Sequence, residues 1–189
     1  MTAVARSAVP RRAAIRSAFT RFTLFDTPIG SCGICWGPRG ILTLQLPEED
    51  AAATCERMLR RYSGAQECAE PDSDVAWLIR GIAQLLNGTP VDFADVRLDM
   101  TGVSPFYQRV YAAAQAVPPG TTRTYGEIAR AISSPMAARA VGQALGRNPF
   151  AIVVPCHRVV AAGGKSGGFS AWGGLSTKLR LLELERRAA

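Results

Sequence analysis

The segment from Ile152 to Arg158 (IVVPCHR) holds the residues best suited to covalent chemistry. An apolar run leads to Cys156, and an imidazole and a guanidinium follow at once. Positive neighbours favour the thiolate, which is the nucleophilic form of a cysteine. The spacing therefore predicts that Cys156 is a reactive thiol. His157, the one histidine of the chain, is then the natural base or proton relay at neutral pH.

A plainer interpretation of the same cysteine stays open. Most free cysteines pack as small buried hydrophobes. Sequence neighbours on an extended strand also point to opposite faces, so the adjacency of Cys156 and His157 does not by itself make a working pair.

Cys32 and Cys35 have the CxxC spacing of a metal or redox site. A structural zinc site needs four ligands, and no second histidine is present to join them. We expect no metal, and we expect both cysteines to be small residues of a β-stretch. The total of five cysteines is odd and does not indicate a disulfide framework, so a reducing compartment is favoured.

Three β-rich stretches near the start of the chain predict a small antiparallel meander. They span residues 21–27, 30–36 and 40–46 and are separated by turn sequences rich in Pro and Gly. Two helices are expected next, one running from the acidic stretch 48–50 to about 62 and one over 72–86.

Two short helices in the second half predict a helix-turn-helix. Thr124 and Glu127 form a capping box that starts a helix ending near residue 132. Ser134, followed by proline, is expected to cap a second helix over 136–147. A tight turn between two such helices is typical of DNA-binding proteins.

Two further helices are expected around this motif. Ser104 caps one over 105–116, where proline takes the first helical position. The other is a C-terminal amphipathic helix over 177–187, with Leu179 and Leu182 on its apolar face and charges opposite.

The charge of the 189-residue chain is unevenly distributed, although its total is only +7. Residues 1–25 hold five arginines and no acid, residues 26–100 hold six arginines and twelve acids, and residues 101–189 hold eleven Lys plus Arg and three acids. So steep an asymmetry indicates that the second half meets a polyanion, with a solvated basic surface as the alternative. The apolar runs are far too short to span a membrane.

The Arg-rich start of the chain allows two interpretations. Its composition fits a mitochondrial transit peptide, and it also fits a disordered basic extension over 1–20. The strong preference for Arg over Lys leads us to expect the extension, on a cytoplasmic bacterial protein.

The segment from Pro155 to Val160 (PCHRVV) resembles the active-site signature of the O6-alkylguanine-DNA alkyltransferases, or methylated-DNA-protein-cysteine methyltransferases. The stretch 137–145, with the Asn-Pro pair at 148–149, is similar to the DNA-recognition helix of that family. The stretch 119–129 is similar to the helix before it. The resemblance is strong over 104–186 and weaker over the meander.

The resemblance implies a suicide repair protein. It would bind the minor groove of double-stranded DNA, flip an O6-alkylguanine and move the alkyl group irreversibly to Cys156. A base inside the stack hides its reacting atom, so a flipping protein must hold the distorted duplex and fill the gap. No cofactor is implied, no membrane partner is expected, and the protein is expected to be a monomer.

The resemblance also assigns DNA contacts. Arg139 matches the arginine that fills the gap, and Ala138 is one of the small residues beside it that approach the groove. Tyr125 matches a tyrosine that helps to rotate the nucleotide and donates to guanine N3. The main-chain carbonyls of Cys156 and Val159 would read the exocyclic amine.

For the chemistry, the resemblance implies a relay from Cys156 through water to His157 and then to Glu185. Asn148 matches an asparagine that braces the turn beside the active-site strand. Arg158 either contacts phosphate or braces the same turn. Other basic residues are expected to contact the DNA backbone or to be solvated, namely Arg123, Arg130, Arg147, Lys165 and Lys178.

The loop over 168–174 departs from the family pattern, because it is two residues longer. Phe169 or Trp172 is expected to form an apolar pocket wall, and Ser170 to contact O6. We expect the added length to alter which alkyl groups fit.

Together these features predict an α+β protein. Residues 21–100 would form a small antiparallel-sheet domain of ribonuclease H-like type. Residues 101–189 would form a mostly helical, winged-helix-like domain that binds DNA and accepts the alkyl group. A catalytically silent damage-recognition protein of the same fold is the main alternative, although such proteins typically lack the cysteine. A cysteine hydrolase and a transcription regulator are further alternatives.

Overall fold

The computed structural model of the chain describes residues 20–164 and 166–186. Apart from Thr20, the expected basic extension lies outside the described residues, and so does Lys165.

The expected meander forms the N-terminal sheet. It consists of β1 (Arg21–Thr27), β2 (Gly30–Gly37) and β3 (Gly40–Gln45), paired antiparallel in chain order. A fourth strand, β4 (Gln66–Glu67), pairs parallel with β1 and gives the order β3-β2-β1-β4. β4 was not expected from the sequence, because a strand of two residues is too short to show alternation of polar and apolar side chains.

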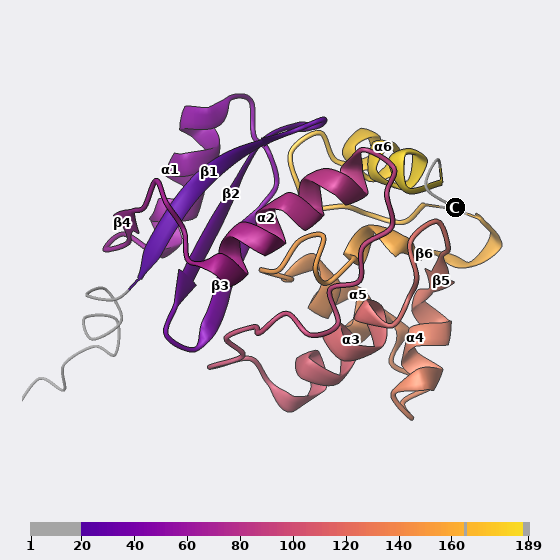
Figure 1. The fold of residues 1–189 in the computed structure, drawn as a ribbon. Helices are drawn as coiled ribbons and strands as arrows, with labels where there is room; N and C mark the ends of the chain where they lie inside the picture. Colours follow the sequence, from indigo (N-terminus) through magenta and orange to yellow (C-terminus); the bar gives the residue numbers. More distant parts are fainter. Residues whose placement is uncertain (1–19, 165, 187–189) are drawn as a thin grey trace, which may run out of the picture.

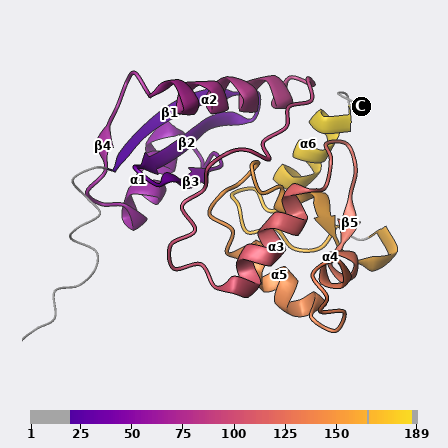
Figure 2. The ribbon, with the colours of Figure 1, turned by 60° about the horizontal axis from the view of Figure 1, so that its bottom comes forward.

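Two helices cover opposite faces of this sheet (Figures 1 and 2). The first is α1 (Ala51–Arg61), where the Asp50 carboxylate accepts a hydrogen bond from the Ala53 N–H at 2.7 Å. Its Met58 packs with Cys35 on one face of the sheet. The second is α2 (Ser73–Leu86), which packs on the other face. The bounds of both helices agree with the sequence pattern.

The second half of the chain is mostly helical, as expected. It contains four helices and a two-stranded parallel sheet: α3 (Pro105–Gln115), α4 (Tyr125–Ala131), α5 (Ala138–Gly146), α6 (Leu175–Arg186), β5 (Arg123–Thr124) and β6 (Val159–Val160). Short 3-10 turns form at Cys156–Arg158 and Ala162–Gly164. The described part of the chain is therefore α+β.

The capping box at the start of α4 is present in both directions. The Glu127 N–H donates to Thr124 Oγ1 at 3.1 Å, and the Thr124 N–H donates to Glu127 Oε2 at 2.6 Å. Ser104 caps α3 as expected, because its hydroxyl accepts from the Tyr107 N–H. These local motifs were predictable because all their partners lie within one helical turn.

The expected start of α5 is wrong. Ser134 does not cap the helix, which begins at Ala138 instead of residue 136. The Ala137 N–H donates to the Ser134 carbonyl at 2.9 Å, so residues 134–137 form a turn. The Ser134 hydroxyl donates back to the carbonyl of Ile132, and the residue at the cap position of the helix is Ala137, which has no side-chain acceptor.

The expected apolar face of α6 is also partly wrong. Leu182 is buried, but Leu179 is 47% exposed. Lys178 and Glu185 are instead buried on the inner side, because each finds a hydrogen-bonding partner there. The helix begins at Leu175, two residues before the expected position, and residue 187 lies outside the described range.

One continuous apolar core joins the two halves. It includes Ile34 and Leu44 of the sheet, Val110 of α3, Val141 of α5 and Leu181 of α6. Among residues 20–164 and 166–186, no helix has the length and apolar character needed to cross a membrane.

Removing the cap that starts α4 should destabilise the protein. We expect Thr124→Ala to lower the free energy of unfolding by about 1 kcal/mol, because the Glu127 N–H loses its acceptor. Urea denaturation measures this change. Thr122→Ala, at an exposed threonine two residues earlier, is the matched control and should change stability little. Equal losses in both variants would contradict the capping role.

Candidate active site

A pocket of about 540 Å³ opens where α4, α5 and the loop before α6 meet. Tyr125 of α4, Ala138 and Arg139 of α5, and Cys156 line it. Phe169 and Ser170 of the loop complete the wall. The structure thus brings six of the expected site residues to one cavity.

Cys156 does not lie on a strand, contrary to the sequence expectation. It begins a 3-10 turn, and the strand that follows contains only Val159 and Val160. The tight turn separates the two neighbouring side chains: Cys156 lies at the pocket, and His157 is buried with 1% of its surface exposed.

Asn148 braces the segment that leads to Cys156. Its Nδ2 donates to the Val154 carbonyl at 2.8 Å, and its Oδ1 accepts from the Phe150 N–H at 2.9 Å. The same Val154 carbonyl accepts from the Cys156 N–H at 2.8 Å. Ile152 within this segment has φ 70°, which is uncommon for a β-branched residue and marks a constrained turn.

The groups around the Cys156 thiol have opposing effects on its pKa. Burial raises the pKa of Cys156 above its usual value. A hydrogen bond from Asn148, the charge of Lys178 and nearby backbone N–H groups all lower the pKa, but burial outweighs them. The sequence suggested a thiolate, whereas the folded chain favours the neutral thiol until a base removes its proton.

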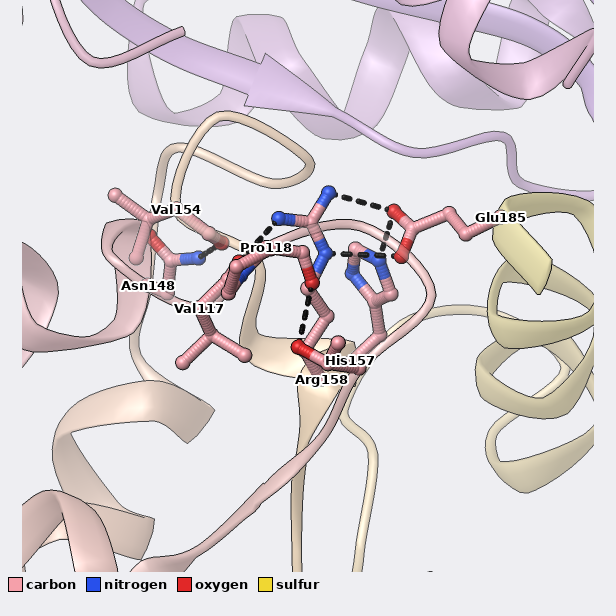
Figure 3. Close-up of polar contacts among 8 residues, drawn as sticks. Val117, Pro118, Asn148, Val154, His157, Arg158 and Glu185 are labelled. Atoms are coloured by element: carbon pink, nitrogen blue, oxygen red, sulfur yellow. Dashed lines mark hydrogen bonds and ion pairs between the residues drawn. The ribbon is translucent and has the colours of Figure 1, made fainter. Parts of the chain in front are cut away.

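The two residues that follow Cys156 form a buried ionic cluster with Glu185 of α6 (Figure 3). His157 Nε2 and Glu185 Oε1 are 2.8 Å apart. Arg158 grips the same carboxylate with two bonds, Nε to Oε2 at 2.9 Å and Nη2 to Oε1 at 2.8 Å. Its Nη1 donates to the Val117 carbonyl at the end of α3, at 2.6 Å. Glu185 and Arg158 are 0% and 4% exposed.

The protonation states of the cluster follow from these contacts. Burial acts to raise the pKa of Glu185, but hydrogen bonds from His157 and Arg158 and the charge of Arg158 outweigh it and lower the pKa to about 2. Burial lowers the pKa of His157, although Glu185 opposes this shift. A neutral imidazole beside a carboxylate must donate from Nε2, so its Nδ1 keeps a lone pair that can accept a proton.

Arg158 braces the turn that follows the thiol. The sequence left phosphate contact and bracing open for this residue, and its contacts in the structure favour bracing. The guanidinium is buried and its bonds go to Glu185 and Val117, so it does not reach a phosphate at the surface.

Lys178 is buried, although the sequence indicated an exposed residue. It was expected to contact the DNA backbone or solvent, but it is 0% exposed. Its Nζ donates to the Val159 carbonyl at 2.7 Å and lies 6.0 Å from the centre of the Tyr125 ring. Burial lowers the pKa of Lys178, and the nearby Cys156 opposes this shift. The spacing of Lys178 and Glu185, seven residues apart on one helix, was the signal that they share a face.

The expected DNA-contacting residues differ in exposure. Arg139 is exposed at the start of α5, whereas Tyr125 is half-buried, and burial raises its pKa. Val159 is fully buried, and its carbonyl already accepts from Lys178; a carbonyl has a second lone pair. Arg123, Arg130 and Arg147 are exposed, as expected.

The long loop closes one side of the pocket. The Ser170 hydroxyl donates to the Gly146 carbonyl at the end of α5, at 3.2 Å. Gly167, at φ 69°, lies so near Tyr125 that an added Cβ would sit 2.9 Å from the tyrosine hydroxyl. Trp172 is not among the pocket residues and is 53% exposed, so Phe169 alone supplies the expected aromatic wall.

Cys32 and Cys35 are both fully buried in β2, as small residues of a β-stretch. Burial raises the pKa of each to about 12, which makes both poor nucleophiles. Within the described ranges, no group of His, Cys, Asp and Glu is arranged to hold a metal ion.

The chain is similar to proteins of known family. Residues 105–187 match the family model described as "6-O-methylguanine DNA methyltransferase, DNA binding domain". A methylated-DNA–protein-cysteine methyltransferase of Mycolicibacterium paratuberculosis is 58% identical over 93 residues, which are 49% of this chain. That match spans about half (54%) of the relative's length.

Longer matches cover both halves of the chain. A crystal structure of the Mycobacterium tuberculosis O6-methylguanine methyltransferase superposes with a TM-score of 0.71 at 35% identity, over 90% of this chain and 94% of that one. A methylated-DNA–protein-cysteine methyltransferase of Methanothermobacter thermautotrophicus is 36% identical over 84% of this chain and 81% of its own length. The chain therefore belongs to the methylated-DNA–protein-cysteine methyltransferase family.

Proposed function

We propose that this protein repairs DNA by moving the O6-alkyl group of a damaged guanine to Cys156, once per molecule. The observation that carries the proposal is the position of Cys156 in the wall of an open pocket, directly before the buried His157–Glu185 pair. A thiol with a fixed proton acceptor behind it is suited to nucleophilic attack.

The proposed transfer balances without a cofactor. A water carries the Cys156 proton to Nδ1 of His157, whose Nε2–H stays bonded to Glu185. The sulfur then attacks the alkyl carbon, an S–C bond forms and the C–O6 bond breaks. The electron pair goes to the guanine, which takes up through water the proton that His157 had received, so His157 returns to its neutral form and Cys156 is left as a stable thioether. None of these reaction steps restores the thiol, so each molecule reacts once.

The partner in this proposal is double-stranded DNA that contains O6-alkylguanine. A crystal structure of the Mycobacterium tuberculosis relative in complex with DNA has a TM-score of 0.71 to this chain, at 35% identity over 89% of it. Arg139 is exposed at the pocket mouth, where it can fill the gap left by a flipped base. Ala138 beside it is small enough to approach the groove. Tyr125 and the carbonyls of Cys156 and Val159 would contact the guanine.

Several finer features belong to the same proposal. The sheet half (residues 21–100) is ribonuclease H-like, and the helical half (101–189) is winged-helix-like. The protein acts as a monomer in the bacterial cytoplasm, where a reducing environment suits its free cysteines. A silent damage-recognition role is not favoured, because Cys156, His157 and Glu185 are all present and two of them are paired.

The direct test of the function is a change in mass. We expect incubation with a duplex containing O6-methylguanine to add one methyl group per molecule, on Cys156, as measured by intact-protein and peptide mass spectrometry. Cys156→Ala should gain none, and Cys55→Ala, at another partly exposed cysteine, should react like the wild type. No adduct, or repeated turnover as in a hydrolase, would contradict the proposal.

Glu185→Gln should weaken both stability and transfer. The neutral amide leaves the Arg158 charge buried without a counter-charge, a change that typically costs about 3–5 kcal/mol. It also stops fixing the His157 tautomer, so transfer to Cys156 should slow.

The stability difference between wild type and Glu185→Gln should depend on pH. The carboxylate has a pKa of about 2 in the fold and about 4.3 in an unfolded chain, so its contribution is complete above the latter and is lost as pH falls toward the former. Urea denaturation from pH 7 to pH 3 should show the gap narrowing. A gap that stays constant would mean that Glu185 is not held as a buried anion.

Arg139→Ala should separate base flipping from chemistry. We expect transfer from duplex DNA to slow by roughly tenfold or more, because the gap left by the flipped base stays open at a cost of a few kcal/mol. Reaction with the free base O6-benzylguanine needs no flipping and should be nearly unchanged. Arg60→Ala, at an exposed arginine of α1 in the sheet half, is the control and should leave both reactions unchanged. Equal slowing with both substrates would contradict the assigned role.

A further inference from the structure

The outer edge of β3 holds the segment that carries Cys156. The Thr43 hydroxyl and the Leu44 N–H both donate to the Pro149 carbonyl, each at 2.8 Å. Leu44 also forms an isolated parallel bridge with Phe150. These contacts join residues more than one hundred positions apart in the chain. Because proline has no N–H, its carbonyl is the one backbone hydrogen-bonding group that Pro149 offers.

The contacts continue from Pro149 to the thiol. Asn148, the next residue along the chain, donates to the Val154 carbonyl at 2.8 Å, and the Cys156 N–H donates to that same oxygen at 2.8 Å. The Val154 N–H donates in turn to the Phe150 carbonyl at 2.8 Å. Two carbonyls, each with two donors, thus link the sheet edge to the nucleophile.

Thr43 has no evident need to be polar for packing alone. Its side chain is 7% exposed in the sheet, a site where valine would fit with the same shape and a high strand propensity. A buried hydroxyl is tolerated when it is hydrogen-bonded, and this one has its bond to Pro149.

We propose that Thr43 is a positioning residue for the reactive cysteine: its hydroxyl fixes the Pro149 carbonyl, and through Asn148 and Val154 it sets the place of Cys156 in the pocket. The N-terminal sheet thereby acts on the reacting thiol, although none of its residues lines the pocket. This inference rests on the proposed function in naming Cys156 as the alkyl acceptor.

The effect of Thr43 should be visible in the titration of the thiol. The hydrogen bond from Asn148 lowers the pKa of Cys156, and it depends on where the amide of Asn148 is held. Other groups around the thiol are Lys178 of α6, Tyr125 of α4, Tyr111 of α3 and the adjoining His157. Lys178, Tyr125 and Tyr111 lie on α6, α4 and α3, whereas Asn148 adjoins Pro149, which Thr43 contacts. A substitution at Thr43 should therefore alter the Asn148 contact first.

The experiment measures alkylation of Cys156 by iodoacetamide as a function of pH, with site-resolved mass spectrometry and no DNA. In Thr43→Val we expect the rate at neutral pH to fall by roughly three- to tenfold, as loss of one hydrogen bond allows, and the pH profile to move to higher pH. Thr43→Ser, which keeps the hydroxyl, should stay close to the wild type. Cys55 in the same molecules reports the intrinsic reactivity of the reagent.

Thr23→Val is the matched control, because it makes the same substitution in β1 of the same sheet. Thermal unfolding of every variant accompanies the kinetics, and Thr43→Ala replaces Thr43→Val if the latter does not fold. A Thr43 variant that is less stable but keeps the wild-type rate and pH profile would overturn the proposal. Equal impairment in Thr43→Ser would do the same. The alkylation assay uses no DNA. Its outcome therefore tests the role of Thr43 even if methyl transfer from DNA fails.

Discussion

The buried carboxylate of Glu185 is the constraint on which the site depends. It is fully buried, and an isolated charge at such a place costs several kcal/mol. Three hydrogen bonds from His157 and Arg158 satisfy it, and Arg158 also bonds to the end of α3. Glu185 lies 28 residues from His157 and 27 residues from Arg158 in the chain. These bonds therefore hold α6 against the 3-10 turn Cys156–Arg158, which presents both side chains. The ion cluster therefore fixes the turn from behind and leaves the thiol facing the pocket.

The same requirement explains the unusual character of α6. An ordinary surface helix keeps its charges outside and its leucines inside. Here Lys178 and Glu185 are buried and Leu179 is exposed. Each buried charge reaches the active-site turn, Lys178 at the Val159 carbonyl and Glu185 at His157. The inner face of α6 thus combines packing with the fixation of the turn on which Cys156 stands.

The parts of the fold that the sequence predicted are those governed by local physics. The Thr124–Glu127 capping box and the cap at Ser104 need only partners three residues away, and the β-meander pairs strands that are neighbours in the chain. The family resemblance pointed to Cys156 and His157 within PCHRVV and to Glu185 near the C-terminus, and the structure pairs the last two. The parts that sequence reasoning missed are long-range. They depend on distant segments that no local pattern specifies. Examples are the burial of Arg158 and Lys178, the contact of Thr43 with Pro149, and the two-residue β4.

The raised pKa of Cys156 appears at first to conflict with a nucleophilic role. Burial holds the thiol neutral, and a neutral thiol reacts slowly with electrophiles in solution. If Cys156 is used once, as we propose, a neutral thiol suits that role, because any stray alkylation would consume the molecule. Asn148 and Lys178 stabilise the thiolate and oppose the effect of burial on the pKa, but burial outweighs them. His157 supplies the proton acceptor, since Glu185 keeps its Nε2–H engaged and its Nδ1 unprotonated. At neutral pH, where burial keeps the thiol protonated, removal of its proton therefore depends on this acceptor.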